Sequence, residues 1–100
     1  MSALILNLRK EYWRQILSGE KKFEYRLVKG YWTTRLIQKY DKVEFRLGYP
    51  KNSQMDRIII CKYEGYEIQE IVHPLFGTEP VTVYAIKVGE VISAPRFAKL

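Results

Sequence analysis

Hydrophobic and polar residues alternate along several short stretches of this chain, with the period of a strand that buries one face. Residues 3–8 are almost all aliphatic and predict the first strand. In residues 23–28 the pattern alternates Phe, Tyr and Leu with Glu, Arg and Val, and residues 43–49 alternate in the same way. We expect the aromatic face of 23–28 to meet the core, with Glu24 and Arg26 side by side on the opposite face.

Strand patterns dominate the second half of the chain. Residues 57–63 are apolar on both faces, which is typical of a central strand. Glu64 and Gly65 interrupt this pattern and predict a bulge or a tight bend, after which the strand resumes. Residues 81–88 predict a last long strand, which Gly89 bends into a short continuation.

Two short helices are predicted in the first half. Residues 10–17 carry four large hydrophobic side chains in one helical stripe, and Gly19 is suited to the left-handed position that ends a helix. Residues 31–40 predict a second helix with Trp32 on its hydrophobic face. The first helix therefore delivers Lys21 into the turn that precedes the strand at 23–28.

Together these elements predict an α+β, mainly β fold with five or six strands and two short helices. Strands of this number and spacing favour a small curled β-barrel, with the loop at residues 73–77 over its mouth. The length of 100 residues fits one domain, and neither a repeat nor a linker divides it. We assign the domain to residues 1–92 and expect a loosely ordered tail over 93–100.

The charge of the chain points to an anionic partner. Its net charge is +6, and residues 1–50 carry eleven Lys and Arg against five Asp and Glu, whereas residues 51–100 carry six of each. All of the excess therefore lies in the half that contains Lys21 and Arg26. A basic surface that only keeps the protein in solution is the alternative.

Other features narrow the class of protein. Cys61 is the single cysteine, in an apolar strand, which predicts a buried thiol and a reducing, cytoplasmic location. No apolar run reaches the roughly 20 residues of a membrane span, and the first residues do not resemble a signal peptide. His73 has no partner at metal-ligand spacing, and no glycine-rich phosphate loop is present, so no metal or cofactor is predicted.

The candidate site is the motif Gly-x-Lys-x-x-Glu-x-Arg at residues 19–26. Lys21, Glu24 and Arg26 offer a carboxylate and two cations to a polar ligand. The alternative is a solvated strand face with cross-strand ion pairs, either Glu24 with Arg46 or Arg26 with Glu44, worth about 0–1 kcal/mol each.

Aromatic residues interleaved with cations favour the ligand-binding interpretation over the solvated strand face. Trp32 and Tyr49 lie close in sequence to Arg35 and Arg46. Aromatic rings stack on bases and cations meet phosphates, so this composition suits single-stranded nucleic acid or a nucleoside. We expect the core to claim other aromatic residues, Trp13 and Phe45 above all.

The chain resembles the ASCH domain of the PUA-like superfamily, especially its small stand-alone phage and bacterial members. The resemblance covers the chain to about residue 92 and rests on the hydrophobic first strand, the Tyr12-Trp13 helix ending in Ser18-Gly19-Glu20-Lys21, Glu24-Tyr25-Arg26, Tyr31-Trp32, Arg35-Leu36, Val43-Glu44-Phe45-Arg46, Gly48-Tyr49 and Val83-Tyr84-Ala85-Ile86-Lys87-Val88-Gly89.

This resemblance implies a PUA-like barrel whose cleft binds RNA or a modified nucleotide. Some ASCH-type proteins are similar to amidohydrolases that act on acylated cytidine, and others to ribonucleases. Lys21 matches the catalytic lysine of the amidohydrolase type, while Glu24 stands where that type has a threonine. A further glutamate of that type has no clear counterpart here; the candidates are Glu64, Glu67, Glu70 and Glu79.

Three functional hypotheses follow. In the first, an RNA- or nucleotide-binding module lines its cleft with Lys21, Glu24, Arg26 and Arg46, and uses Tyr49 or Trp32 as a stacking wall. In the second, a small hydrolase of acylated nucleosides or RNA uses Lys21 and Glu24 as catalytic residues. In the third, the basic face binds and blocks another protein.

Overall fold

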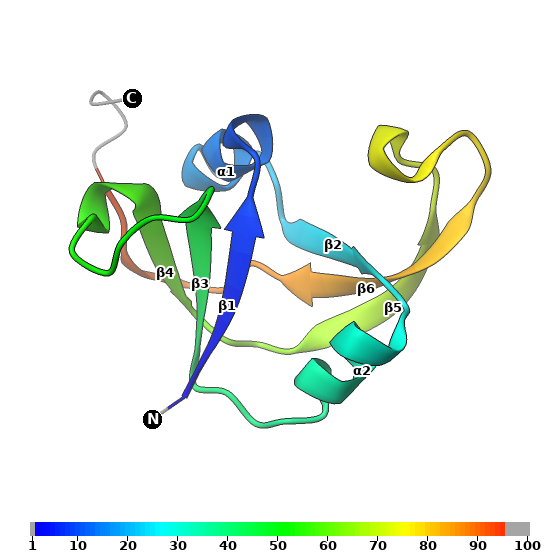
Figure 1. Ribbon diagram of the computed structural model, residues 1–100, viewed down its shortest axis with the longest axis horizontal. Helices are drawn as coiled ribbons and strands as arrows, with labels where there is room; N and C mark the ends of the chain where they lie inside the picture. Colours follow the sequence, from blue (N-terminus) through cyan, green and yellow to red (C-terminus); the bar gives the residue numbers. More distant parts are fainter. Residues whose placement is uncertain (1, 96–100) are drawn as a thin grey trace.

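The computed structural model describes residues 2–95 and consists of seven strands, two α-helices and two 3-10 turns (Figure 1). In chain order the elements are β1 (Ala3–Leu8), α1 (Lys10–Leu17), β2 (Phe23–Leu27), α2 (Gly30–Leu36), β3 (Lys42–Leu47), η1 (Met55–Arg57), β4 (Ile58–Lys62), β5 (Tyr66–Ile71), η2 (Pro74–Phe76), β6 (Val81–Lys87) and β7 (Val91–Ser93).

The strands form two sheets. The first sheet has the order β1-β3-β4-β7, with β1 and β3 parallel and the other pairs antiparallel. The second sheet has the order β2-β6-β5 and is antiparallel throughout. In Figure 1 the strands of the second sheet run across those of the first, α1 lies above β1 and β3, and α2 lies below the second sheet.

The mainly β, α+β class predicted from the sequence is confirmed, but the closed barrel is not found in residues 2–95. There are seven strands rather than five or six, and β1 and β2 are edge strands of separate sheets. The chain crosses between the sheets where the sequence predicted a bulge: β4 lies in the first sheet, and β5, after Glu64 and Gly65, lies in the second. Gly65 allows this turn because its φ is +88°.

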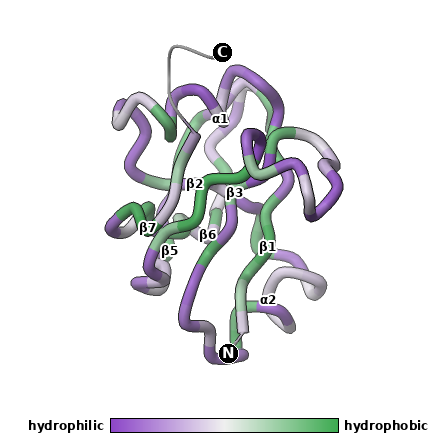
Figure 2. Tube along the Cα trace, turned by 90° about the vertical axis from the view of Figure 1, so that its left-hand side faces the viewer, coloured by the Kyte–Doolittle hydropathy of each residue, from purple (hydrophilic) through white to green (hydrophobic). Residues whose placement is uncertain are grey.

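The core lies between the sheets and α1. Leu4, Leu6, Trp13 and Phe45 are fully buried there, and the hydrophobic colour follows β1 in Figure 2. The indole nitrogen of Trp13 donates to the Phe45 carbonyl at 2.9 Å, which fixes α1 on β3. The predictions that Trp13 and Phe45 belong to the core are therefore confirmed.

Two further predictions about the core can be checked. Cys61 is buried and free, and burial raises the pKa of its thiol to about 11. Its strand β4 lies inside the first sheet, as the apolar pattern indicated.

The predicted second helix is too long at its C-terminal end. α2 ends at Leu36, not at Tyr40. The Tyr40 hydroxyl instead donates to the Arg35 carbonyl at 2.6 Å and occupies an acceptor at the end of the helix. At the other end of the chain β7 includes Ser93, and the predicted tail falls mostly on residues 96–100, outside the described residues.

Gly89 is required where the chain turns from β6 into β7. A Cβ atom at this position would overlap the Lys62 carbonyl oxygen and crowd the Glu64 side chain. We expect Gly89→Ala to lower the free energy of unfolding by about 1–3 kcal/mol, measured by urea denaturation.

The matched control is Gly30→Ala. No atom lies within 4 Å of a Cβ there, and alanine in a helix is favoured over glycine by about 0.5–1 kcal/mol. Equal stabilities of the two variants would contradict the close approach at Gly89.

Candidate ligand-binding cleft

The orientation of β2 places charged side chains on the inner face of the second sheet. Glu24 is paired with Ile86 and Arg26 with Tyr84 on the neighbouring strand β6. Directly paired residues point to the same face of a sheet, and Ile86 and Tyr84 belong to the core. The prediction that the aromatic face of this strand meets the core is therefore wrong, because the core-facing positions carry Glu24 and Arg26.

Glu24 is buried and is held between two cations. Its Oε1 lies 3.0 Å from Lys21 Nζ, and its Oε2 lies 2.8 Å from Arg26 Nη2. The three side chains are only 10% (Lys21), 9% (Glu24) and 20% (Arg26) exposed. A buried carboxylate needs such partners, because an uncompensated charge loses its hydration. The sequence motif is therefore one compact cluster.

The turn after α1 brings Lys21 to this cluster. Gly19 has a φ of +84°, and the Lys21 backbone N–H donates to the Gln15 carbonyl at 3.0 Å. The ammonium group lies 4.8 Å from the centre of the Tyr12 ring and 5.0 Å from that of Tyr25. Two aromatic faces and a carboxylate thus fix its position.

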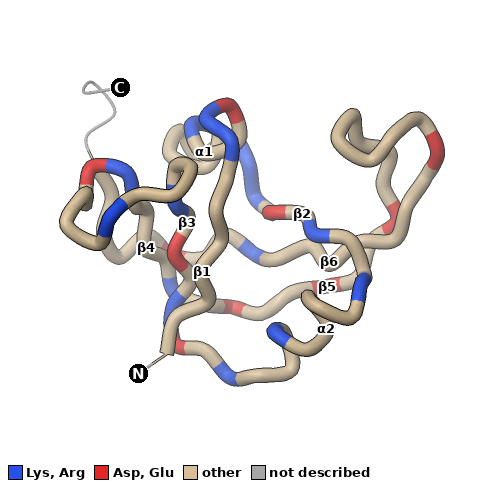
Figure 3. Tube along the Cα trace, viewed as in Figure 1, with Lys and Arg blue, Asp and Glu red and all other residues tan. Residues whose placement is uncertain are grey.

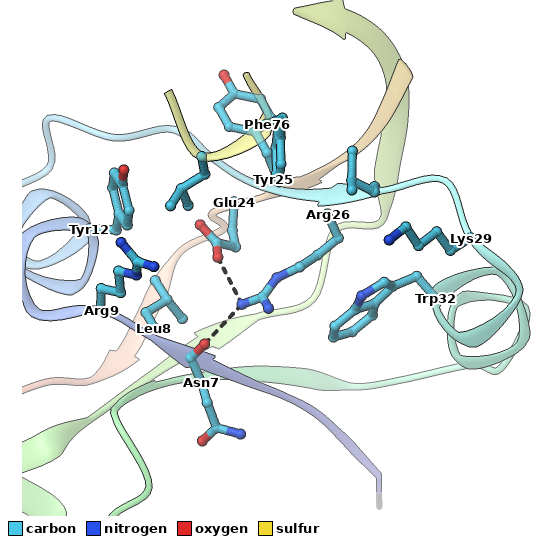
Figure 4. Close-up of a pocket in the computed structure, with 12 residues that line it drawn as sticks. Asn7, Leu8, Arg9, Tyr12, Glu24, Tyr25, Arg26, Lys29, Trp32 and Phe76 are labelled. Atoms are coloured by element: carbon cyan, nitrogen blue, oxygen red, sulfur yellow. Dashed lines mark hydrogen bonds and ion pairs between the residues drawn. The ribbon is translucent and has the colours of Figure 1, made fainter. Parts of the chain in front are cut away.

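Arg26 connects the edges of the two sheets. Its Nη2 donates to the Asn7 carbonyl of β1 at 3.1 Å as well as to Glu24 (Figure 4). Its guanidinium carbon lies 4.9 Å from the centre of the Trp32 ring. Its Nε is buried and has no hydrogen-bond partner. A side chain therefore spans the gap that backbone hydrogen bonds would close in a barrel.

A first hollow of about 290 Å³ opens beside this cluster. Figure 4 shows Glu24 and Arg26 on its wall, between Tyr12 and Arg9 on one side and Trp32 and Lys29 on the other. Its lining comes from β1, α1, β2, α2 and η2, namely Asn7, Leu8, Arg9, Tyr12, Glu24, Tyr25, Arg26, Leu27, Lys29, Trp32, Leu75 and Phe76.

A second hollow of about 460 Å³ adjoins the first and shares Asn7, Arg26 and Trp32 with it. Its other lining residues are Ile5, Tyr31, Arg35 and Tyr49. We refer to the two hollows together as the cleft. Figure 3 shows cationic segments around it, after the C-terminal end of β1, before and along β2, and on α2.

Most of the predicted site residues meet in the cleft. Glu24, Arg26 and Trp32 line the first hollow, and Tyr49 lines the second with 90% of its surface exposed. Lys21 lines neither hollow and adjoins the cleft through its ion pair with Glu24. Trp32 is not a free stacking wall, because the Arg26 guanidinium lies over its ring.

Arg46 lies outside the lining of both hollows. Its guanidinium binds Glu44 of the same strand at 2.6 and 3.0 Å and Asn52 at 3.3 Å. The cross-strand pairs considered from the sequence are thus replaced by pairs within strands, Glu24 with Arg26 and Glu44 with Arg46.

Several lining residues are not among the predicted site residues, namely Asn7, Arg9, Tyr12, Lys29 and Phe76. Arg9 and Lys29 each directly follow a predicted strand, which is a weak signal for a site. Burial, then the charge of Glu11, raises the pKa of Tyr12, so its hydroxyl keeps its proton and can donate. Asn7 gives no signal beyond being the one polar residue in the first strand.

The loop after β5 closes one end of the first hollow. His73 accepts a hydrogen bond at Nδ1 from the Leu75 backbone N–H at 3.2 Å. Its ring lies 5.5 Å from Tyr12 and 6.2 Å from Tyr25, measured between centroids. The loop expected to cover a barrel mouth thus contributes Leu75 and Phe76 to the cleft.

The glutamates considered as a further catalytic acid lie elsewhere. Glu64, Glu67, Glu70 and Glu79 line neither hollow, and Glu67 accepts a hydrogen bond from Gln69 at 2.8 Å. Within residues 2–95 no three His, Cys, Asp or Glu side chains are grouped so that they could hold a metal ion. No helix in this part of the chain is long and apolar enough to cross a membrane.

Comparison with known proteins gave no match to a family model, to a curated protein or to a solved structure.

The burial of Glu24 between two cations predicts a large effect of neutralising it. We expect Glu24→Gln to lower the free energy of unfolding by about 2–4 kcal/mol, because Lys21 and Arg26 would both lose their buried counter-ion. Chemical denaturation at neutral pH measures this loss.

Glu44→Gln is the matched control, since Glu44 also pairs with an arginine two residues away, but with one cation and with 18% of its side chain exposed. We expect a smaller loss there than at Glu24, because only one cation, Arg46, loses its counter-ion. An equal loss of unfolding free energy in the two variants would show that the second cation at Glu24 adds nothing to stability.

Proposed function

We propose that this protein binds RNA or a nucleotide, including modified nucleotides, through the cleft around Lys21, Glu24 and Arg26. The proposal includes a relationship to the ASCH domains, which the sequence motif suggests. It also places the protein in a reducing cytoplasm, in keeping with the single free cysteine Cys61.

The observation that carries this proposal is the fixed guanidinium of Arg26. Glu24, the Asn7 carbonyl and the Trp32 ring hold it in place, and it borders both hollows. A planar cation held in this way offers a flat face on which a base can stack and a charge that attracts phosphate. Because it is already ordered, little side-chain entropy is lost when a ligand binds.

The charges of the cleft support an anionic ligand. Arg9, Arg26, Lys29 and Arg35 line the two hollows, and Glu24 is the one carboxylate among the lining residues. The second lone pair of each Glu24 oxygen can accept a hydrogen bond from an exocyclic amino group of a base. Cations for phosphate and an acceptor for a base edge are therefore present together.

The binding test uses a labelled single-stranded RNA at low salt, followed by fluorescence anisotropy. We expect the affinity to fall steeply with added salt, and Arg26→Ala to weaken binding about 10-fold or more, as expected for loss of a charged hydrogen-bond partner. Arg26→Lys should restore only part of the loss, because it keeps the charge without the planar group.

Arg57→Ala is the control, because Arg57 is exposed and lines neither hollow. Its affinity should stay within about twofold of that of the unchanged protein, since a surface charge away from the ligand acts only at long range. Thermal unfolding of each variant separates lost binding from lost folding. No binding at low salt, or equal binding by the Arg26 and Arg57 variants, would refute the proposal.

The hydrolase hypothesis is favoured by one distance, the 3.0 Å between Lys21 Nζ and Glu24 Oε1. However, the Lys21 ammonium group is already engaged by the Glu24 carboxylate, so it is not free to act on a ligand. For Lys21 to be catalytic, a bound ligand would have to displace Glu24 from the Lys21 ammonium group.

Incubation with N4-acetylcytidine and with labelled RNA tests this hypothesis. Turnover that disappears in Lys21→Ala, while Arg57→Ala, outside the cleft, remains active, would make the protein a hydrolase. We expect binding without turnover, because no second acid lies among the lining residues.

A further inference from the structure

We propose that the two hollows hold successive nucleotides of one single strand, with Arg26 and Asn7 between them, so that the natural ligand is an oligonucleotide rather than a single nucleotide. This inference rests on the proposed function and assigns separate roles to the two hollows.

The two hollows form one continuous surface. They share Asn7, Arg26 and Trp32. Their volumes of about 290 and 460 Å³ are each at the scale of a small-ligand site. A ligand that fills the first hollow therefore leaves the larger one empty unless it continues past Arg26.

Their chemistry differs in a way that fits a base in the first and a stacked nucleotide in the second. The first hollow contains the Glu24 carboxylate and the apolar side chains of Leu75 and Phe76, together with the cations Arg9 and Lys29. A carboxylate repels phosphate but accepts hydrogen bonds from the amino group of a base. We therefore place a base in the first hollow, with its phosphate toward Arg26.

The second hollow has no carboxylate in its lining. It combines Arg26 and Arg35 with the rings of Tyr31, Trp32 and Tyr49. Two arginines and several aromatic rings without an acid are the composition of a stacking platform for single strands. Tyr49 is 90% exposed, so its ring is available to a base, whereas the Tyr31 ring already carries the Arg35 guanidinium on one face.

Two aromatic rings and a hydroxyl hold the Arg35 guanidinium beside the second hollow. Its Nη1 donates to the Tyr31 hydroxyl at 2.9 Å, and its guanidinium carbon lies 5.6 Å from the centres of both the Tyr31 and Trp32 rings. Its Nε is buried and has no hydrogen-bond partner. The aromatic rings therefore position this cation beside the second hollow.

Asn7 provides a contact common to both nucleotides. Its backbone carbonyl accepts a hydrogen bond from Arg26. Its side chain extends away from the ion-pair cluster in Figure 4. An amide offers both a donor and an acceptor to a base edge. The Asn7 side chain can thus contact whichever base lies next to the shared wall.

The experiment compares the four nucleoside 5′-monophosphates with a single-stranded RNA tetranucleotide of mixed sequence, by calorimetry on the complete chain. We expect the tetranucleotide to bind at least about tenfold more tightly, from stacking in the second hollow. Tyr49→Ala should weaken tetranucleotide binding about 5- to 100-fold and leave monophosphate binding within about twofold. Tyr49→Phe, which keeps the ring, should restore it.

Arg35→Ala should behave like Tyr49→Ala, whereas Phe76→Ala, in the first hollow, should weaken both ligands by a similar factor. The inference is overturned if the tetranucleotide binds no more tightly than a monophosphate, or if Tyr49→Ala weakens both ligands equally; in either case the proposed function stands. Absence of binding by both kinds of ligand overturns the proposed function together with this inference.

Discussion

The structure depends on the way in which one buried carboxylate is neutralised. Glu24 takes a cation on each oxygen, Lys21 from the turn after α1 and Arg26 from its own strand. Burying three charged side chains on the inner face of a sheet is unfavourable unless each has a partner, because all three lose water. Once the partners are in place, the carboxylate fixes the turn, the strand and the direction of Arg26 together.

Arg26 links the second sheet, to which its strand belongs, to the first sheet. Its guanidinium reaches the free edge of β1 through the Asn7 carbonyl and rests on Trp32 of α2. Both hydrogen bonds come from one nitrogen, Nη2, so what a lysine would lose here is the planar group that lies over the Trp32 ring. The second helix is also tied to the second sheet, where the hydroxyls of Thr33 and Tyr84 lie 2.6 Å apart.

The cleft exists because the two sheets do not close. Backbone pairing between β1 and β2 would bring their edges to about 5 Å and fill the space with the ladder itself. Side chains join them instead, and this leaves room for the two hollows of about 290 and 460 Å³. The features that place charge in the interior therefore also create the concave surface on which the proposed function depends.

The sequence by itself determined the positions of most elements, because hydrophobic periodicity and glycine turns act locally. It located β1, α1 and β4, identified Trp13, Phe45 and Cys61 as buried, and brought Lys21, Glu24 and Arg26 together, since they are separated by only a few residues. Tertiary structure alone decided which face of β2 points inward. The alternating pattern divides the side chains of this strand between two faces, but it does not say which face contacts the core. It also decided which distant residues complete the cleft. Asn7 of the first sheet and Phe76, which follows the second sheet's β5, meet there only because the two sheets pack together. Arg46, so similar in sequence context to Arg26, is directed away from the cleft to Glu44.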